Sequence, residues 1–123
     1  MARLVDLSKK PYNLNPSQIE WVESTIKGMT DEEKVGQLFT NLFFFGGDAF
    51  SGNNLSNKEI LEKYHIGSVR YMNGSPEDVQ GLINDLQSQT KIPLLVAANC
   101  DSGGGGAVKC GTYISSIFSL FNG

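Results

Sequence analysis

The chain has 123 residues, 40 % of them hydrophobic, which suffices for one domain with a single core. Its formal net charge of −3 and its 10 dispersed Lys and Arg residues argue against nucleic acid or an anionic membrane as partners, because both need clustered cations. The N-terminus lacks the apolar core of a signal peptide, and no stretch reaches the roughly 18 apolar residues of a membrane span. We therefore expect a cytoplasmic protein.

Two helix signals open the chain. Apolar residues within Ser17–Lys27 recur at the spacing of one helix face, with Asn15-Pro16 before them and Gly28 after them. Thr30 and Glu33 then form the pattern of a capping box, in which each side chain bonds the other residue's backbone N–H. The sequence predicts a second helix that begins there and is short.

Three apolar segments predict three strands, which run from Leu38 or Thr40 to Phe45, over Ile66–Met72 and over Ile92–Ala98. Consecutive strand residues alternate between faces, so Phe43, Phe44 and Phe45 are expected to fill both faces of the sheet rather than to stack on a ligand. The third segment is almost uninterrupted, which is typical of a strand covered on both faces. A polar loop is expected over residues 46–54.

Two further helices are expected between these strands. One covers Lys58–Tyr64 and is capped by Ser56 or Asn57, and the other opens at Ser75 and Pro76. The second carries an apolar stripe of Val79, Leu82, Ile83 and Leu86. Alternating helices and strands indicate an α/β fold with a parallel sheet and right-handed crossovers, in which ligands bind at the carboxyl ends of the strands.

The segment Asn99–Gly106, which contains four consecutive glycines, follows the third strand at that end. A phosphate loop needs a lysine directly after the last glycine, but Gly106 is followed by Ala107. A dinucleotide-binding fingerprint needs a third glycine where Val108 or Lys109 stands, so the segment fits neither motif. No pair of residues has a recognised metal-ligand spacing, so we expect neither a metal nor a cofactor. A simple glycine turn and a ligand loop remain open as alternatives.

Cys100 and Cys110 lie on either side of the glycines. They could pair, but nothing else in the chain is typical of a secreted, disulfide-stabilised scaffold, and two reduced thiols are the simpler interpretation.

Three segments in order resemble the N-terminal domain of glycoside hydrolase family 3. They are Met29-Thr30-Asp31-Glu32-Glu33-Lys34-Val35-Gly36-Gln37-Leu38-Phe39, then Ile66-Gly67-Ser68-Val69-Arg70-Tyr71 with Asn73 and the helix Gln80–Gln87, and last Pro93-Leu94-Leu95-Val96-Ala97-Ala98 with Asn99-Cys100-Asp101-Ser102-Gly103-Gly104. The resemblance covers about residues 29–113. It implies a single partial domain with a helical lead-in over 1–28 and an unassigned tail over 114–123.

The resemblance implies the first three βα units of a TIM-barrel-like (β/α)8 domain, incomplete in this chain. It also implies a glycosidase that removes a non-reducing-end β-linked sugar, N-acetylhexosamine or glucose, with retention. That chemistry needs a carboxylate nucleophile and a proton donor, which in the family come from a later strand and from a later loop or another domain. This chain is thus expected to supply no catalytic residue and to be inactive alone.

The residues expected near the sugar are Asn99, Asp101 and Arg70. Asn99 stands where one branch of the family has the aspartate that holds sugar hydroxyls, so either Asn99 or Asp101 would face the substrate, and Asp101 could also be an ordinary turn acid. Arg70 would reach Asp101 across the strand ends or lie where water reaches it.

The alternative function is a small non-enzymatic α/β module that binds a partner or a carbohydrate. On either hypothesis the open edges of a three-stranded sheet would favour self-association.

Overall fold

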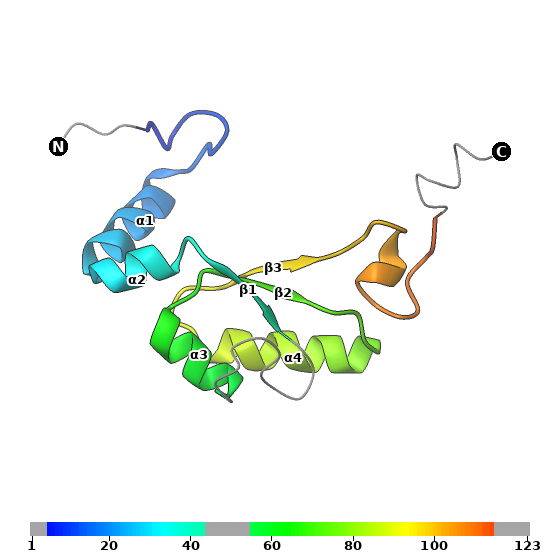
Figure 1. Ribbon diagram of the computed structural model, residues 1–123. Coiled ribbons are helices and arrows are strands. Elements are labelled where there is room, and N and C mark those ends of the chain that lie inside the picture. The colour runs from blue at the N-terminus through cyan, green and yellow to red at the C-terminus, as the bar shows by residue number, and fades with distance from the viewer. Residues whose placement is uncertain (1–4, 44–54, 115–123) are drawn as a thin grey trace.

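The computed structural model describes residues 5–43 and 55–114, with Phe43 described by its backbone alone. In chain order the elements are α1 (Pro16–Gly28), α2 (Asp31–Gly36), β1 (Thr40–Phe43), α3 (Asn57–Tyr64), β2 (Ser68–Tyr71), α4 (Pro76–Ser88), β3 (Leu95–Ala98) and the 3-10 turn η1 (Gly104–Gly106) (Figure 1). The predicted order of helices and strands is confirmed. The predicted loop 46–54, Phe44, Phe45 and nearly all of the tail lie outside the described residues.

Local side-chain signals set the helix starts. In α1, α2 and α3 the cap is reciprocal: the side chains of Asn15, Thr30 and Ser56 accept from the backbone three residues on, while Gln18, Glu33 and Glu59 bond back to the cap. The capping box predicted at Thr30 is confirmed, and Ser56 rather than Asn57 caps α3. Each box satisfies backbone N–H groups that the helix itself leaves unpaired.

The three strands form a parallel sheet in the order β1-β2-β3. Ser68 of β2 pairs with Thr40 on one side and Leu95 on the other, and Arg70 pairs with Leu42 and Ala97. Because side chains alternate along a strand, Ser68 and Arg70 share one face of the sheet while Val69 and Tyr71 share the other.

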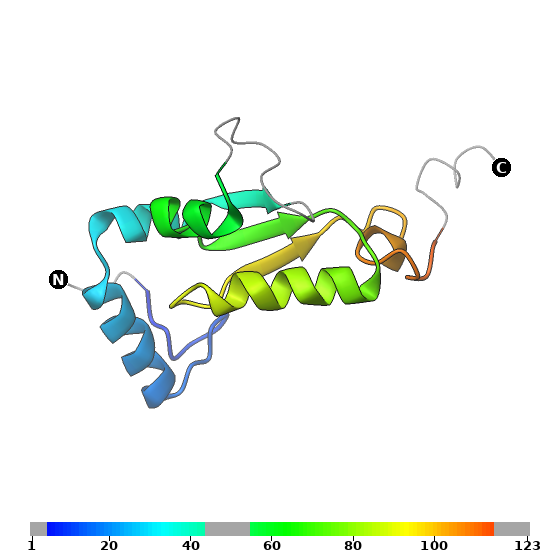
Figure 2. The same ribbon diagram turned by 90° about the horizontal axis from the view of Figure 1, so that it is seen from below.

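The core lies on the face of Val69. Helices α3 and α4 lie against this face (Figure 2). The side chain of Val69 is 1 % exposed and packs with buried residues of these helices and of the loops beside the strands, namely Ile60, Leu61, Ile66, Leu86 and Leu94. The apolar stripe predicted along α4 is thus turned toward the sheet, with Val79 and Leu86 buried and Leu82 and Ile83 half-buried.

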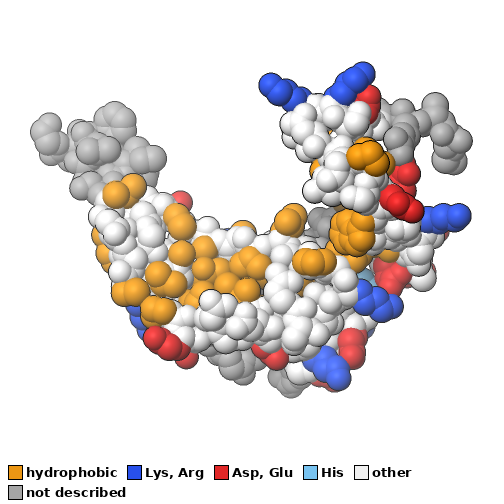
Figure 3. Space-filling model, turned by 180° about the vertical axis from the view of Figure 1, so that it is seen from behind, with side chains coloured by type: hydrophobic (Ala, Val, Ile, Leu, Met, Phe, Trp, Pro, Cys, Tyr) orange, Lys and Arg blue, Asp and Glu red, His pale blue; other side chains and the backbone are white. Residues whose placement is uncertain are grey.

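The opposite face of the sheet is open in the described part of the chain, and this overturns one prediction. β3 was expected to be covered on both faces, yet on the open face Leu95 is 75 % exposed and Ala97 is exposed too. Val96, which pairs with Val69 and shares its face, is itself 40 % exposed. An apolar run signals burial in the finished sheet, but the helices described here lie against one face only. Figure 3 shows hydrophobic side chains gathered on the hollowed side of the molecule, between its two raised ends.

The end of α2 is joined tightly to the α3–β2 connection. A Cβ on Gly36 would lie 2.2 Å from the carbonyl oxygen of Tyr64, and one on Gly67 would lie 2.3 Å from that of Gln37. The Gln37 side chain donates to the carbonyl of His65 at 2.8 Å. These contacts hold the N-terminal helices at the amino ends of the strands, at the far end of the molecule from η1 (Figures 1 and 2).

Within residues 5–43 and 55–114, no helix has the length and apolar character that a membrane span requires.

Candidate functional site

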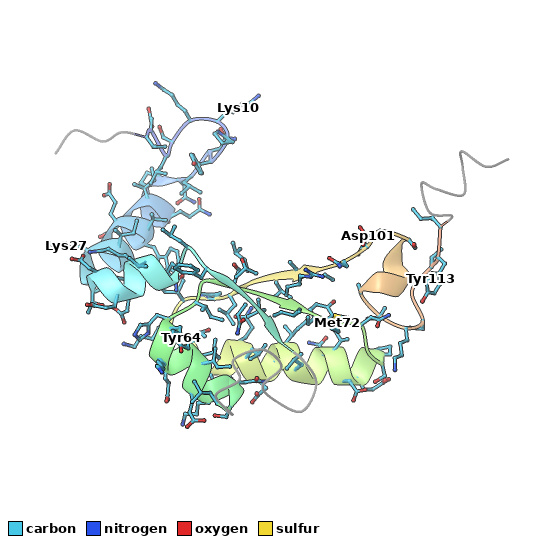
Figure 4. All side chains as sticks on the ribbon, in the orientation of Figure 1. Lys10, Lys27, Tyr64, Met72, Asp101 and Tyr113 are labelled. Carbon is cyan, nitrogen blue, oxygen red and sulfur yellow. The ribbon has the colours of Figure 1, made fainter. Side chains whose placement is uncertain are left out.

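Asn99 and Asp101 lie just beyond the carboxyl end of β3, where the α/β topology was predicted to place a ligand site. Both side chains are exposed. The backbone turns between them and the glycines, because the N–H of Gly103 donates to the carbonyl of Cys100 at 3.0 Å. Asp101 stands on one raised end of the molecule (Figure 4).

The glycines after Asp101 form a packed turn. Gly103 has φ of 88°, a backbone conformation that favours glycine, and η1 follows it directly. A Cβ on Gly106 would lie 1.7 Å from the carbonyl oxygen of Asn99. Only glycine permits this approach, so Gly106 lies directly on the backbone of a predicted sugar-binding residue.

Tyr113 closes the other side of the turn. Its ring lies against Gly105, where a Cβ would be 2.3 Å from Cζ. Gly103 and Tyr113 form an antiparallel bridge, and the N–H of Ile114 donates to the carbonyl of Ser102 at 3.0 Å. The segment 99–114 therefore folds back on itself into a compact loop, which we call the glycine loop.

The glycine loop is also bonded to the loop after β2. Asn73 Nδ2 donates to the carbonyl of Gly105 at 2.7 Å, and the N–H of Lys109 donates to the carbonyl of Gly74 at 2.9 Å. Sequence reasoning missed both contacts. The Asn73-Gly74 pair indicates a turn at a strand end, but no local pattern shows that this turn bonds a segment more than thirty residues away.

Arg70 is half-buried on the open face, one residue before the end of β2. Its Nε is buried and has no hydrogen-bond partner within the described ranges 5–43 and 55–114. Among the described residues no ion pair joins Arg70 to Asp101, so the contact suggested from the sequence is absent and the second possibility, a side chain that water reaches, fits the half-exposure. The strand pairing gives Arg70 the neighbours Leu42 and Ala97, whose apolar side chains have no hydrogen-bond acceptor.

Two of the other reactive side chains, Cys100 and Cys110, belong to the glycine loop, whereas His65 lies at the end of α3. Cys100 and Cys110 are exposed free thiols, and His65 caps the end of α3 with φ of 50°. No three His, Cys, Asp or Glu residues in the described segments are grouped so that they could hold a metal ion. A groove of about 720 Å³ lies between α2 and α3, lined in part by Val35, Phe39 and Tyr64, away from the glycine loop.

No family model matches the chain. A curated protein of Cellulomonas fimi described as "Beta-N-acetylglucosaminidase/beta-glucosidase" is 28 % identical over 117 residues, which is 95 % of this chain and 20 % of that protein. The chain thus spans about a fifth of the length of this relative.

Two solved structures are similar in fold and in sequence. The "Beta-glucoside phosphorylase BglX bound to 2FGlc" has a TM-score of 0.72 and 34 % identity over 87 % of this chain and 19 % of its own. The structure of "Beta-glucoside phosphorylase BglX" has a TM-score of 0.66 with the same identity, over 87 % of this chain and 18 % of its own. The resemblance drawn from the three sequence segments is confirmed: the chain is a small α/β unit with a three-stranded parallel sheet, and it is similar to part of a glycoside hydrolase family 3 protein.

Proposed function

We propose that this chain is the substrate-side part of an enzyme that acts on a non-reducing-end β-linked glucose or N-acetylhexosamine. It would form the first three βα units of a (β/α)8 barrel, whose full circuit takes about 250 residues. The parallel sheet with helices on one face and an open second face supports this proposal, because the open face of such a unit is the one that lines a barrel. Residues 1–28 would be a helical lead-in to the βα units of 29–113.

Asn99, Asp101 and Arg70 are the residues that we propose to contact the sugar. The observation that carries this is their placement: two exposed polar side chains at the carboxyl edge of the sheet, and a half-exposed cation on its open face. Carboxylate and amide oxygens accept from sugar hydroxyls, while the amide and guanidinium N–H groups donate to sugar oxygens.

Cleavage would need residues that this chain does not supply. A retaining glycosidase uses two carboxyl groups about 5 Å apart on opposite sides of the glycosidic bond, and the family's positions for them match no residue here. We therefore expect the chain to bind a monosaccharide and to leave glycosides intact. With hydrogen bonds from one wall of a site only, the affinity would be in roughly the millimolar range.

The test is a titration of the 15N-labelled 123-residue chain with glucose and with N-acetylglucosamine, followed by amide chemical shifts. We expect saturable shifts at residues 99–106 and at the guanidinium N–H groups of Arg70, and none in α1. D101N should weaken binding several-fold, whereas D85N, the same change on the exposed side of α4, should not. Uniformly small, non-saturating shifts would refute the sugar site and favour the non-enzymatic module.

Turnover is tested separately with 4-nitrophenyl β-glucoside and β-N-acetylglucosaminide, each with and without phosphate, because the relatives' names include both a glucosidase and a phosphorylase. We expect no product from this chain under either condition. Product formed by the pure chain would show that a catalytic carboxylate lies within it.

We also propose self-association through the edges of β1 and β3, next to the exposed Leu95. The cytoplasmic location stays a prediction of the sequence.

A further inference from the structure

We infer that Asn73 is a positioning residue of the sugar site, acting on Asn99 through the glycine loop without itself reacting. This rests on the proposed function for its purpose, and on the contacts of the loop for its mechanism. The chain of contacts runs from the Asn73 side chain to Gly105, from there to the adjacent Gly106, and from Gly106 to the carbonyl of Asn99.

The hydrogen bond between Asn73 and Gly105 can form in one direction only. A carbonyl oxygen accepts hydrogen bonds and never donates one, so the Asn73 side chain must present its NH2 group to Gly105. The 2.7 Å bond is partly shielded from water, and Gly105 is buried beneath the Tyr113 ring. Loss of the donor would leave a shielded carbonyl unpaired, which costs more than loss of an exposed bond.

The contact between Gly106 and the Asn99 carbonyl couples the position of the 3-10 turn to that of Asn99. Gly105 and Gly106 belong to the same 3-10 turn, in which the N–H groups of Gly106 and Ala107 donate to Gly103 and Gly104 at 3.1 and 3.0 Å. Because Gly106 fits against the Asn99 carbonyl without space for even a methyl group, a shift of the turn must move Asn99 or open a gap beside it. Asn73, in the loop after β2, thus fixes where the residue after β3 presents its side chain.

N73D tests this with almost no change of shape. The introduced carboxylate cannot donate and faces the Gly105 carbonyl, so we expect the affinity for glucose or N-acetylglucosamine to fall about tenfold at pH 7. Amide hydrogen exchange at Gly106 and Ala107 should rise by a similar factor, while exchange in β2 and α4 stays unchanged. N84D, which makes the same change at an exposed position of α4, is the matched control.

Acid should rescue the variant. Once protonated, the introduced carboxyl group can donate its O–H to Gly105, so the ratio of wild-type to N73D affinity should fall toward one below about pH 4. Such a recovery would show that sugar binding depends on a hydrogen-bond donor at this position and not only on the shape of the side chain. If N73D does not fold, N73A, which removes the donor without adding a charge, takes its place for affinity and exchange.

Sugar affinity within twofold of wild type would overturn the inference, as would a tenfold loss with unchanged exchange at Gly106 and Ala107. If the wild-type chain itself binds no sugar, the proposed function fails. The positioning of Asn99 is then decided by the exchange data alone: local loosening of the loop in N73D supports it, and its absence overturns it.

Discussion

The side-chain amide of Gln87 pairs with the backbone of Leu94 through two hydrogen bonds. Its Nε2 donates to the Leu94 carbonyl and its Oε1 accepts from the Leu94 N–H, both at 2.9 Å. At Leu94, the residue before β3, this side chain near the end of α4 makes the two backbone hydrogen bonds that a neighbouring strand would otherwise make. Leu94 is 5 % exposed, so water cannot readily replace either bond.

Gln87→Glu should destabilise the fold by about 1–3 kcal/mol, because the carboxylate cannot donate to the Leu94 carbonyl. The midpoint of urea unfolding, followed by circular dichroism, measures the change. Gln80→Glu is the matched control: Gln80 is exposed on the same helix and bonds only Asn84 among the described side-chain contacts, so its effect should be within about 0.5 kcal/mol. Equal effects of the two substitutions would contradict the importance of this pairing.

Gly106→Ala should distort the glycine loop, since the added methyl group would overlap the Asn99 carbonyl. We expect a loss of about 1–3 kcal/mol in stability together with altered amide shifts at residues 99–106. Gly81→Ala is the opposite case. Beyond its chain neighbours and the helix's own backbone, no atom of the described residues lies within 4 Å of a Cβ at this position, so the substitution should stabilise the chain by about 0.5–1 kcal/mol. Thermal unfolding of the two variants beside wild type gives opposite signs if the packing is as described.

Glu59 should contribute a pH-dependent part of the stability. Hydrogen bonds from the Ser56 side chain and backbone, at 2.7 and 2.8 Å, hold the pKa of this carboxyl below its usual value near 4.5. A group whose pKa is lower in the folded state stabilises the fold above the unfolded-state pKa, and this contribution is lost as the pH falls through the folded-state value. The extra stability of wild type over Glu59→Gln should therefore be larger at neutral pH than at about pH 3. Glu20→Gln on α1 controls for the loss of one charge, and a difference that does not change with pH would be evidence against the cap.

Leu95→Lys should reduce self-association. Leu95 lies on the open face of an edge strand, and a charged side chain there opposes pairing with a second chain. Size-exclusion chromatography over a range of concentrations should show larger species for wild type than for the variant. A wild-type peak at the monomer position at all concentrations would refute the prediction.

The elements of this fold could be predicted because their signals are local. Thr30 with Glu33 and Ser75 with Pro76 each mark a helix start within a few residues, and the structure begins α2 and α4 there. The exposure of Leu95 could not be predicted, because an apolar run reports the surroundings of a finished domain and not which face the described helices reach.

The position of the candidate site could also be predicted, because the carboxyl end of β3 follows from the order of the elements. The contacts that hold the site together could not be predicted. The bond from Asn73 to Gly105 and the packing of Tyr113 on Gly105 join segments that carry no shared pattern. The glycines themselves gave the one available signal, since several of them in succession permit close approach of backbone or ring.

The capping boxes of α1, α2 and α3 also bear on the order of folding. Each box is complete within four consecutive residues, so these helix starts can form while the rest of the chain is still unstructured. The parallel strands differ, because every pairing joins residues separated by an intervening helix and must await closure of that loop. In a pulse-labelling experiment, amides of α1–α3 should gain protection before those of β2, whose two neighbours both arrive from distant parts of the chain.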